Sequence, residues 1–256
     1  MNSYIDNKLH IKWEKNYICG VSKNLVIIPT YNEKENIANI IEVVLNLEEN
    51  FHILVVDDGS PDGTGEIVDN LIKTHPNRLS ILHRKEKNGL GPAYIAGFKV
   101  ALERGYEYIF EMDADFSHPP ADLINLLRNT RDKNFDITVG SRYIKGGGVK
   151  NWSWDRHILS RGASFYVQAI TWMPVKDPTA GFVCYRAKVL ETLDLDKVAF
   201  KGYAFQIEMK YTSWKKGFKI SEYPITFIDR ELGTSKMDMS IVKEGILGVL
   251  KMKFRV

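Results

Sequence analysis

Cysteine is scarce in this sequence, and several features that define common protein classes are missing. Among 256 residues there are only two cysteines, Cys19 and Cys184, which are far apart and lack the spacing of metal ligands. This scarcity excludes a disulfide framework and fits a reducing compartment. The formal net charge is only +3, which is too small to indicate nucleic acid as the main partner.

Long hydrophobic runs are also missing. The first twenty residues carry several charged side chains and no apolar core of the kind that a signal peptide has, so we predict no secretory leader. No apolar run approaches the roughly 20 residues that are needed to cross a bilayer. We therefore predict no transmembrane helix, although a protein of this composition can still lie on a membrane surface.

Short apolar, β-branched runs alternate with stretches that have helical apolar spacing. The runs begin near residues 25, 53, 79, 108 and 137, and the sequence between the first two has a helical apolar face. This alternation predicts an α/β fold with an open, mostly parallel sheet flanked by helices. After about residue 144 we expect an extension of the same sheet, with a glycine loop at 146–148, helices near 155–171 and 204–214, and strands near 181–185 and 220–228.

Two carboxylates, Asp113 and Asp115, directly follow the fourth predicted strand. Because they are one residue apart in an extended chain, they point to the same side. Such oxygen ligands suit Mg²⁺ or Mn²⁺, with phosphate oxygens and water completing the shell. A solvated turn is the common alternative for such a pair. The position at a strand end, and the sequence that follows at 116–120, favour a metal site here.

Three further groups of residues leave a structural and a functional interpretation open. The pair Asp57–Asp58 ends the second predicted strand and suits a ribose and base, although the following turn residues would also cap a helix. Arg156 and Ser160 are neighbours on one helix face and, with Arg142, suit a phosphate, or they form surface ion pairs. The loop 230–236 could close over a diphosphate or be a solvated basic loop.

These motifs, in this order, resemble the family 2 glycosyltransferases of the GT-A (nucleotide-diphospho-sugar transferase) fold. More narrowly, they are similar to the dolichyl-phosphate and polyprenyl-phosphate mannosyltransferases. The resemblance runs from about residue 25 to about residue 236. It is carried by the segments Ile28–Glu33, Val56–Ser60, Asn88–Ala93, Met112–Asp115, His118–Pro120, Gly140–Tyr143, Ser160–Ala163, Asp177–Phe182, Gly202–Glu208 and Gly233–Lys236.

The resemblance implies a role for each motif. It places Mg²⁺ or Mn²⁺ on Asp113 and Asp115, and the acceptor phosphate on Arg142, Arg156 and Ser160. Asp115, Arg142, Arg230 and Lys236 would act in catalysis. Ser117 departs from the family, whose members often carry Gln there. The donor, which the resemblance indicates is GDP-mannose, would be bound by Pro29, Tyr31, Glu33, Asp58, Asp113, Ala114, Asp115, Arg230 and Lys236.

The chemistry of the acceptor decides whether a catalytic base is needed. A polyprenyl or dolichyl phosphate is a phosphomonoester with a second pKa of about 6, so it is already a nucleophile at neutral pH. We expect direct attack at the anomeric carbon with inversion. A sugar hydroxyl acceptor, as in surface-polysaccharide synthesis with UDP-glucose or another donor, would need a base, for which Asp177 or Glu208 are the candidates.

Two other classes fit the sequence less well. A sugar nucleotidyltransferase would carry a glycine-rich, basic loop after the first strand, where this chain has Pro29–Glu33 without glycine or a cation. A non-catalytic nucleotide-binding subunit would not need the pair Asp113 and Asp115.

The expected domain organisation follows from the extent of the resemblance, about residue 25 to about residue 236. We expect an N-terminal extension at 1–22, a GT-A catalytic domain at 23–238 and a C-terminal amphipathic helix at 239–256. The apolar face of that helix has lysines beside it, as in helices that lie in a membrane interface, and packing on the domain is the alternative. We expect a cytoplasmic protein held peripherally on the cytoplasmic face of a membrane.

Overall fold

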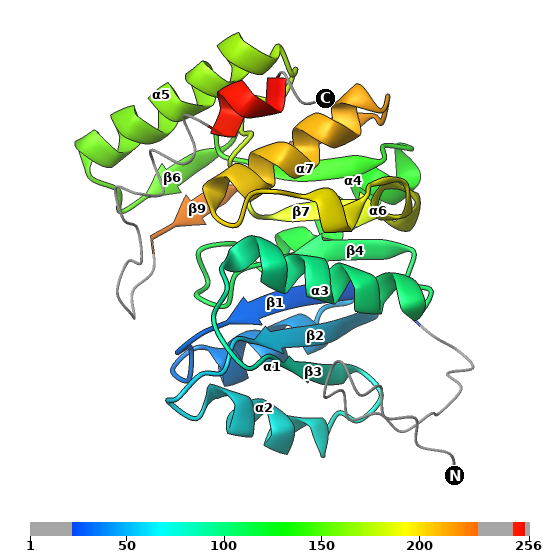
Figure 1. Ribbon diagram of the computed structural model, residues 1–256. Coiled ribbons are helices and arrows are strands. Elements are labelled where there is room, and N and C mark those ends of the chain that lie inside the picture. Colours follow the sequence, from blue (N-terminus) through cyan, green and yellow to red (C-terminus); the bar gives the residue numbers. More distant parts are fainter. Residues whose placement is uncertain (1–21, 230–247, 254–256) are drawn as a thin grey trace.

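The computed structural model describes residues 22–229 and 248–253 (Figure 1). The first part of the chain alternates strands and helices, as predicted. The second part is less regular and includes a short 3₁₀ helix, Leu195–Lys197. In chain order the other elements are β1 (Asn24–Thr30), α1 (Ile37–Leu45), β2 (Phe51–Asp57), α2 (Thr64–Ile72), β3 (Leu79–His83), α3 (Leu90–Glu103), β4 (Tyr108–Glu111), α4 (Asp122–Asp132), β5 (Ile137–Ser141), β6 (Gly148–Lys150), α5 (Trp154–Thr171), β7 (Val183–Arg186), α6 (Ala187–Thr192), α7 (Tyr203–Lys215), β8 (Ile220–Pro224) and β9 (Thr226–Ile228).

The central sheet has seven strands in the order β3-β2-β1-β4-β7-β5-β8. Strand β1 pairs in parallel with β2 and β4, and β2 with β3, while β5 pairs in parallel with β8. Only β7 runs against its neighbours, since it is antiparallel to both β4 and β5. The prediction of a mostly parallel sheet flanked by helices is therefore confirmed.

Both faces of the sheet are covered by helices, which explains why its strands are apolar without interruption. Along β1 the side chains alternate between two clusters: Leu25 and Ile27 enter one, and Val26 and Ile28 enter the other. The first cluster packs on α3, α6 and α7, and the second on α1, α2 and α4. Helix α3 approaches β1 closely, because a Cβ on Gly97 would lie 2.7 Å from Ile27.

The structure departs from the sequence predictions in the second part of the chain. The predicted glycine loop at 146–148 ends in a strand, since Gly148 begins β6. The predicted strand at 220–228 is two strands, β8 in the main sheet and β9, which pairs in parallel with β6 in a separate two-stranded sheet. Three-residue strands are too short to show a period of two, and their pairing joins residues far apart in sequence.

The described part of the C-terminal segment, residues 248–253, is helical and packs on the domain. Val249 and Met252 are buried beside α5 and α7, whereas Leu250, Lys251 and Lys253 are exposed. The rest of the amphipathic stretch predicted at 239–256 lies outside the described residues, as does nearly all of the extension 1–22. Among the helices of the described ranges, none is both long and apolar enough to span a bilayer.

Candidate functional site

Polar side chains collect where β1, β2, β4 and β5 end, which is the edge of an open α/β sheet where ligands bind. Asp57, at the end of β2, joins two of these strands. Its carboxylate accepts hydrogen bonds from the Thr30 hydroxyl at 2.8 Å and from the hydroxyl and N–H of Ser60 at 2.6 and 3.0 Å. Asp57 is 2% exposed, so it braces the ends of β1 and β2 and is not positioned to receive a ligand.

Asp58, predicted to bind the donor, is paired with a cation that the sequence analysis did not single out. Nη1 of Arg84 lies 2.7 Å from its carboxylate. Burial raises the pKa of Asp58, and the charge of Arg84 opposes that rise. Lys87 lies 4.5 Å above the ring of Tyr31, another predicted donor residue. Arg84 and Lys87 both follow β3, so this strand end also brings cations to the same edge.

Two further predicted donor residues, Pro29 and Glu33, lie at the end of β1 and just after it. Pro29 is half-buried within the strand, and Glu33 is half-buried just after it. The backbone N–H of Glu33 donates to the hydroxyl of Thr64 at 3.0 Å, and its carboxylate accepts from Asn36 at 3.3 Å. The first bond holds the β1–α1 loop against the start of α2, and the second lies within the loop, just before α1.

The two carboxylates after β4 lie in a tight turn. The side chain of Asp113 is 39% exposed, Ala114 is buried at 3%, and the carboxylate of Asp115 accepts the N–H of Ser117 at 3.1 Å. Phe116 has a φ of 59°, a left-handed conformation that is uncommon for an aromatic residue. The turn thus directs the chain back under the two carboxylates.

His118 packs against this turn from the buried side. Its Nδ1 accepts the N–H of Asp113 at 3.4 Å, and its ring stacks on Phe182 with centroids 5.0 Å apart. Burial lowers the pKa of His118 to about 4, so the imidazole is neutral near pH 7. The sequence analysis assigned no catalysis to histidine, and this one packs beneath the turn.

The carboxylates of Asp113 and Asp115 fit an oxygen-liganded cation. In the described ranges, no group of three or more His, Cys, Asp and Glu side chains could hold a metal by itself. Mg²⁺ is commonly held by one or two carboxylates together with substrate phosphates and water. Two half-exposed carboxylates at the ligand edge of the sheet match that arrangement. Ser117, the residue that departs from the pattern of the resembled family, is only 1% exposed.

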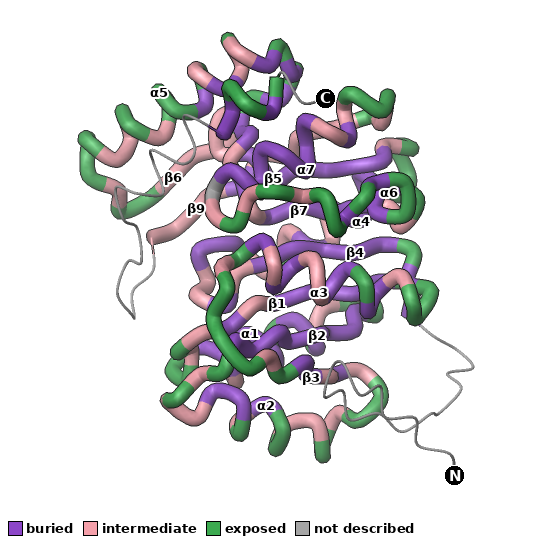
Figure 2. Tube along the Cα trace, in the orientation of Figure 1, coloured by how far each residue is buried: buried purple, intermediate pink, exposed green. Residues whose placement is uncertain are grey.

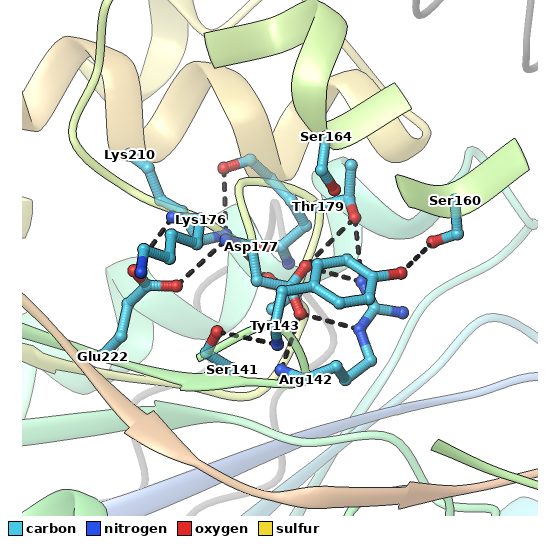
Figure 3. Close-up of polar contacts among 12 residues, drawn as sticks. Ser141, Arg142, Tyr143, Ser160, Ser164, Lys176, Asp177, Thr179, Lys210 and Glu222 are labelled. Carbon is cyan, nitrogen blue, oxygen red and sulfur yellow. Dashed lines mark hydrogen bonds and ion pairs between the residues drawn. The ribbon is translucent and has the colours of Figure 1, made fainter. Parts of the chain in front are cut away.

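The corner predicted to bind the acceptor, called the acceptor corner below, lies at the end of β5 and is built around Arg142 (Figure 3). Its Nε and Nη2 donate to the two carboxylate oxygens of Asp177 at 2.7 and 2.6 Å, and Nη2 also donates to Thr179 at 2.9 Å. The backbone N–H of Arg142 donates to the same carboxylate at 2.9 Å. The Arg142 side chain is 10% exposed and that of Asp177 is 0% exposed. This is a bidentate, buried ion pair.

Trp152 brings the second arginine to this corner. The guanidinium carbon of Arg156 lies 4.4 Å from the Trp152 ring centroid, and that of Arg142 lies 5.5 Å from it. Arg156 also forms an ion pair with Asp229, at the end of the described chain. Trp152 precedes α5 directly after β6, so the small sheet positions it. The sequence analysis did not select Trp152, although its position in the sequence between the motif arginines Arg142 and Arg156 was a usable signal.

Ser160 completes the predicted acceptor group. The Tyr143 hydroxyl donates to Ser160 Oγ at 2.7 Å, which ties α5 to the end of β5 (Figure 3). One turn further along α5, Ser164 is 3% exposed, and its Oγ has no hydrogen-bond partner among the described residues. The structure thus brings Arg142, Arg156 and Ser160 to one corner. Their role in binding a phosphate stays a prediction.

The loop that carries Asp177 is fixed on two sides (Figure 3). Glu222 of β8 accepts the N–H groups of Lys176 and Asp177 at 2.9 and 3.0 Å. Lys210 of α7 donates to the carbonyl of Ala180 at 2.7 Å. Lys210 is 0% exposed, and burial lowers its pKa. The position of the Arg142–Asp177 pair is therefore set by β8 and α7.

Lys210 belongs to a buried polar group that also includes Glu111, two residues before the first carboxylate of the turn after β4. Glu111, at the end of β4, is 0% exposed, and burial raises its pKa while the charge of Lys210 opposes the rise. Polar atoms of Glu111, Gln206, Tyr94 and Tyr185 have no hydrogen-bond partner among the described residues. This group could not be predicted from the sequence, because its members lie on four different elements, β4, α3, β7 and α7.

The two candidate bases are occupied by structural contacts. Asp177 neutralises Arg142, as described above. Glu208 of α7 is 7% exposed and accepts the N–H groups of Ala199 and Phe200 at 2.9 and 3.1 Å. Neither carboxylate is arranged to take a proton from a substrate. Arg230 and Lys236, predicted to hold the diphosphate, lie outside the described residues.

Comparison with protein families and curated proteins gives consistent matches. The model of glycosyl transferase family 2 matches residues 25–194. A polyprenol monophosphomannose synthase of Mycolicibacterium smegmatis is 47% identical over 233 residues, which cover 91% of this chain and 88% of that protein. An undecaprenyl-phosphate mannosyltransferase of Micrococcus luteus is 44% identical over 227 residues, covering 89% of this chain and 92% of that protein.

Solved structures share the fold at low sequence identity. Glucosyl-3-phosphoglycerate synthase from Mycobacterium tuberculosis, in complex with phosphoglyceric acid, has a TM-score of 0.65 at 15% identity and covers 90% of this chain and 79% of its own. A mannosyltransferase from Pyrobaculum calidifontis, in complex with GDP-mannose and Mn²⁺, has a TM-score of 0.57 at 16% identity and covers 91% and 73%. Both likenesses concern the fold alone.

Proposed function

Since the chain belongs to glycosyl transferase family 2, we propose that it transfers mannose from GDP-mannose to a polyprenyl phosphate. The names of two relatives above 40% identity support the lipid phosphate acceptor and the mannosyl group. GDP-mannose is the donor bound in one structure of the same fold. The catalytic domain is proposed to extend over residues 23–238.

The acceptor corner supports a phosphate as the nucleophile. Two guanidinium groups, Arg142 and Arg156, share one tryptophan ring, and Ser160 lies on the same face of α5 as Arg156. Arginine matches phosphate oxygens in geometry and charge. An incoming phosphomonoester would be oriented there with an oxygen toward the anomeric carbon, and its attack would invert that centre.

The observation that carries this proposal is the engagement of both candidate bases. A hydroxyl nucleophile has to lose a proton, and Asp177 and Glu208 are committed to Arg142 and to backbone N–H groups. A phosphate dianion needs no base, because its second pKa is about 6. Neither of these two residues is an available base, which favours an acceptor that is already ionised.

On the donor side, we propose that Tyr31, Glu33 and Asp58 bind the nucleoside, with Pro29 and Ala114 lining the site. Asp113 and Asp115 would hold Mg²⁺ or Mn²⁺, which neutralises the diphosphate as it leaves. Arg230 and Lys236 are proposed to bind the same diphosphate. With the nucleophile already ionised, the residues of the chain act by positioning the two substrates and stabilising charge.

We further propose that the protein works peripherally on the cytoplasmic face of a membrane. A polyprenyl chain is held in the bilayer, so an enzyme that uses it must approach the bilayer surface. A nucleotide-sugar donor is supplied from the aqueous side.

The decisive experiment offers labelled GDP-mannose or UDP-glucose to the purified protein, with Mg²⁺ or Mn²⁺ and a polyprenyl phosphate. Label that enters the organic phase reports transfer to the lipid. We expect GDP-mannose-dependent transfer that EDTA abolishes and that is lost in Asp115→Ala. The matched control is Asp155→Ala, which removes an exposed carboxylate from the start of α5.

Other results of this assay would indicate a different donor, acceptor or reaction. Transfer from UDP-glucose alone would keep the mechanism and change the donor. Donor hydrolysis without a lipid product would indicate a hydroxyl acceptor, and would contradict the assignment of the Arg142 corner to a phosphate. Synthesis of the nucleotide sugar itself would favour the nucleotidyltransferase alternative, which family membership does not support.

A further inference from the structure

Strand β9 lies between the turn after β4 and the acceptor corner. The backbone N–H of Ile228 donates to the carbonyl of Ser117 in that turn at 3.2 Å. The ring of Phe227 packs edge-on against His118 beneath the turn and against Trp152 of the acceptor corner, with ring centroids 5.5 Å apart in each case. Figure 2 shows β9 in the intermediate class, whereas β1, β2 and β4 are mostly buried. A partly exposed strand therefore contacts both the turn of the predicted metal ligands and the acceptor corner.

Asp229, the residue after β9, brings a carboxylate to the acceptor corner. Its backbone N–H donates to the carbonyl of Lys150 at 3.2 Å, which extends the pairing of β9 with β6 by one bond. Its carboxylate forms the ion pair with Nη1 of Arg156 that was described above. The pairing of two short strands thus holds a negative charge against one of the two guanidinium groups that are predicted to bind the acceptor phosphate.

The two arginines of the corner are held by their carboxylates in different ways. Arg142 and Asp177 have side chains that are 10% and 0% exposed, and their contact is bidentate. Arg156 and Asp229 have side chains that are both 26% exposed. Breaking a buried ion pair leaves a charge without hydration, whereas water replaces much of what a partly exposed pair loses. Asp229 is therefore the carboxylate that an incoming anion displaces at the smaller cost.

We propose that Asp229 is a positioning residue of the acceptor corner, whose carboxylate holds Arg156 and is displaced from it by the phosphate of the acceptor. The ring of Trp152, 4.4 Å from the guanidinium carbon of Arg156, keeps the guanidinium in place while its anionic partner changes. A phosphate with two negative charges attracts the guanidinium more strongly than a carboxylate with one. The inference rests on the proposed function for the identity of that phosphate.

The proposed reaction itself reverses this preference. An oxygen of the phosphate monoester forms the bond to the anomeric carbon, and the bond from that carbon to the donor diphosphate breaks, so that its electron pair leaves with the diphosphate. The acceptor phosphate thereby changes from a dianion to a monoanionic diester, and the diphosphate gains one negative charge. The diester attracts Arg156 less strongly than the monoester did. Asp229 then competes for the guanidinium again, which favours release of the product.

Two unreactive probes test the displacement without any transfer. Butyl phosphate is a monoester like the acceptor, and methyl butyl phosphate is a diester like the product. Both are titrated calorimetrically into the protein at about pH 8, above the second pKa of a monoester, which is about 6. We expect the wild type to bind the monoester about tenfold more tightly than the diester. Asp229→Asn, which keeps the shape and removes the charge, should tighten the binding of both probes about fivefold.

Two matched variants separate displacement from other effects of charge. Asp229→Glu keeps the carboxylate and should bind both probes like wild type. Asp194→Asn removes the same charge from an exposed pair with Lys197 and should change both affinities less than twofold. Thermal unfolding by circular dichroism verifies that each variant is folded. Weaker probe binding by Asp229→Asn, or equal tightening by Asp194→Asn, would overturn the proposal. So would a crystal structure in which butyl phosphate contacts Arg156 while the pair with Asp229 stays intact.

Activity separates this inference from the proposed function. In transfer assays Asp229→Asn should lower KM for the polyprenyl phosphate about fivefold, leave KM for the donor within twofold, and strengthen inhibition by the mannosylated product about fivefold. A merely structural role would lower kcat and tighten nothing. If Asp229→Asn tightens both probes but the wild type transfers mannose to no lipid phosphate, the proposed function fails and the displaceable pair stands. If transfer occurs and Asp229→Asn leaves both probe affinities unchanged, the pair is not displaced and the proposed function stands.

Discussion

The strand ends that are predicted to bind the donor, here the donor edge, and the acceptor corner use aspartate in opposite ways. Asp113, at the donor edge, has a side chain that is 39% exposed in a turn after β4. Asp177, at the acceptor corner, is 0% exposed and holds both nitrogen donors of the Arg142 fork. The carboxylate of Asp113 is partly exposed at the edge of the sheet, and that of Asp177 is paired with Arg142 inside the protein. Exposure and partners, rather than residue type, therefore indicate which acids can serve chemistry.

The difference has an energetic cause. A carboxylate at 0% exposure loses its hydration, so it needs a partner in good geometry. Arg142 supplies that partner and is itself kept in place. A half-exposed carboxylate keeps part of its hydration, which the proposed cation and diphosphate would replace on binding. We therefore expect substitutions at the donor edge to reduce activity with little change in stability, and substitutions at the acceptor corner to reduce both.

The largest effect is expected from Asp113→Asn. Loss of a metal-binding carboxylate should lower kcat by about 1000-fold, because the leaving diphosphate is then poorly neutralised. The free energy of unfolding should stay within about 0.5 kcal/mol of wild type, since the side chain is partly exposed. Transfer assays and urea unfolding measure the two quantities. A large loss of stability would show that Asp113 is structural and would remove the contrast with Asp177.

Asp177→Asn should give the next largest effect, this time on stability. It leaves the buried guanidinium of Arg142 without its counter-charge, which costs about 3 kcal/mol. Urea unfolding checks this value. The double variant Arg142→Met/Asp177→Leu should recover much of the lost stability and remain inactive. If Asp177→Asn folds as stably as wild type but loses a base-dependent limb of its pH–rate profile, Asp177 acts as a base and the comparison breaks.

The smallest effect is expected from Arg156→Gln, which sharpens the assignment of the acceptor corner. Removing one of the two cations proposed to bind the phosphate should raise KM for the polyprenyl phosphate about 30-fold, which is within the range that a charged hydrogen bond contributes. KM for the donor should not change. Arg128→Gln is the control, since Arg128 lies on α4 and forms an exposed ion pair with Glu48. A rise in the donor KM instead would move Arg156 to the diphosphate.

Much of the fold could be predicted because the first five strands and their helices have regular apolar patterns. The positions predicted on α1 are all buried, for example, and the strand starts agree closely with β1 to β5. The short strands β6 and β9 could not be predicted in the same way. Each has three residues, and their pairing depends on a contact between residues 148–150 and 226–228.

The candidate site could be predicted as a set of residues but not as a set of partners. Asp177 was a candidate base because the sequence shows its carboxylate but not its contact with Arg142, which is 35 residues away and neutralises it. Trp152 and Lys210 were missed for the same reason, since their importance comes from neighbours on other elements. Trp154, Ile158 and Phe165 have the spacing of one helix face, and only the structure shows that these side chains of α5 are exposed.

The late position of β7 in the sequence has a consequence for synthesis of the chain. Strand β4 pairs on one side with β1, but its other neighbour, β7, begins at Val183. A nascent chain that has passed β4 therefore carries an open strand edge until β7 emerges, and such an edge can pair with other chains. We expect ribosome-bound fragments that end between β4 and β7 to need chaperone protection, and fragments that include β7 to need less.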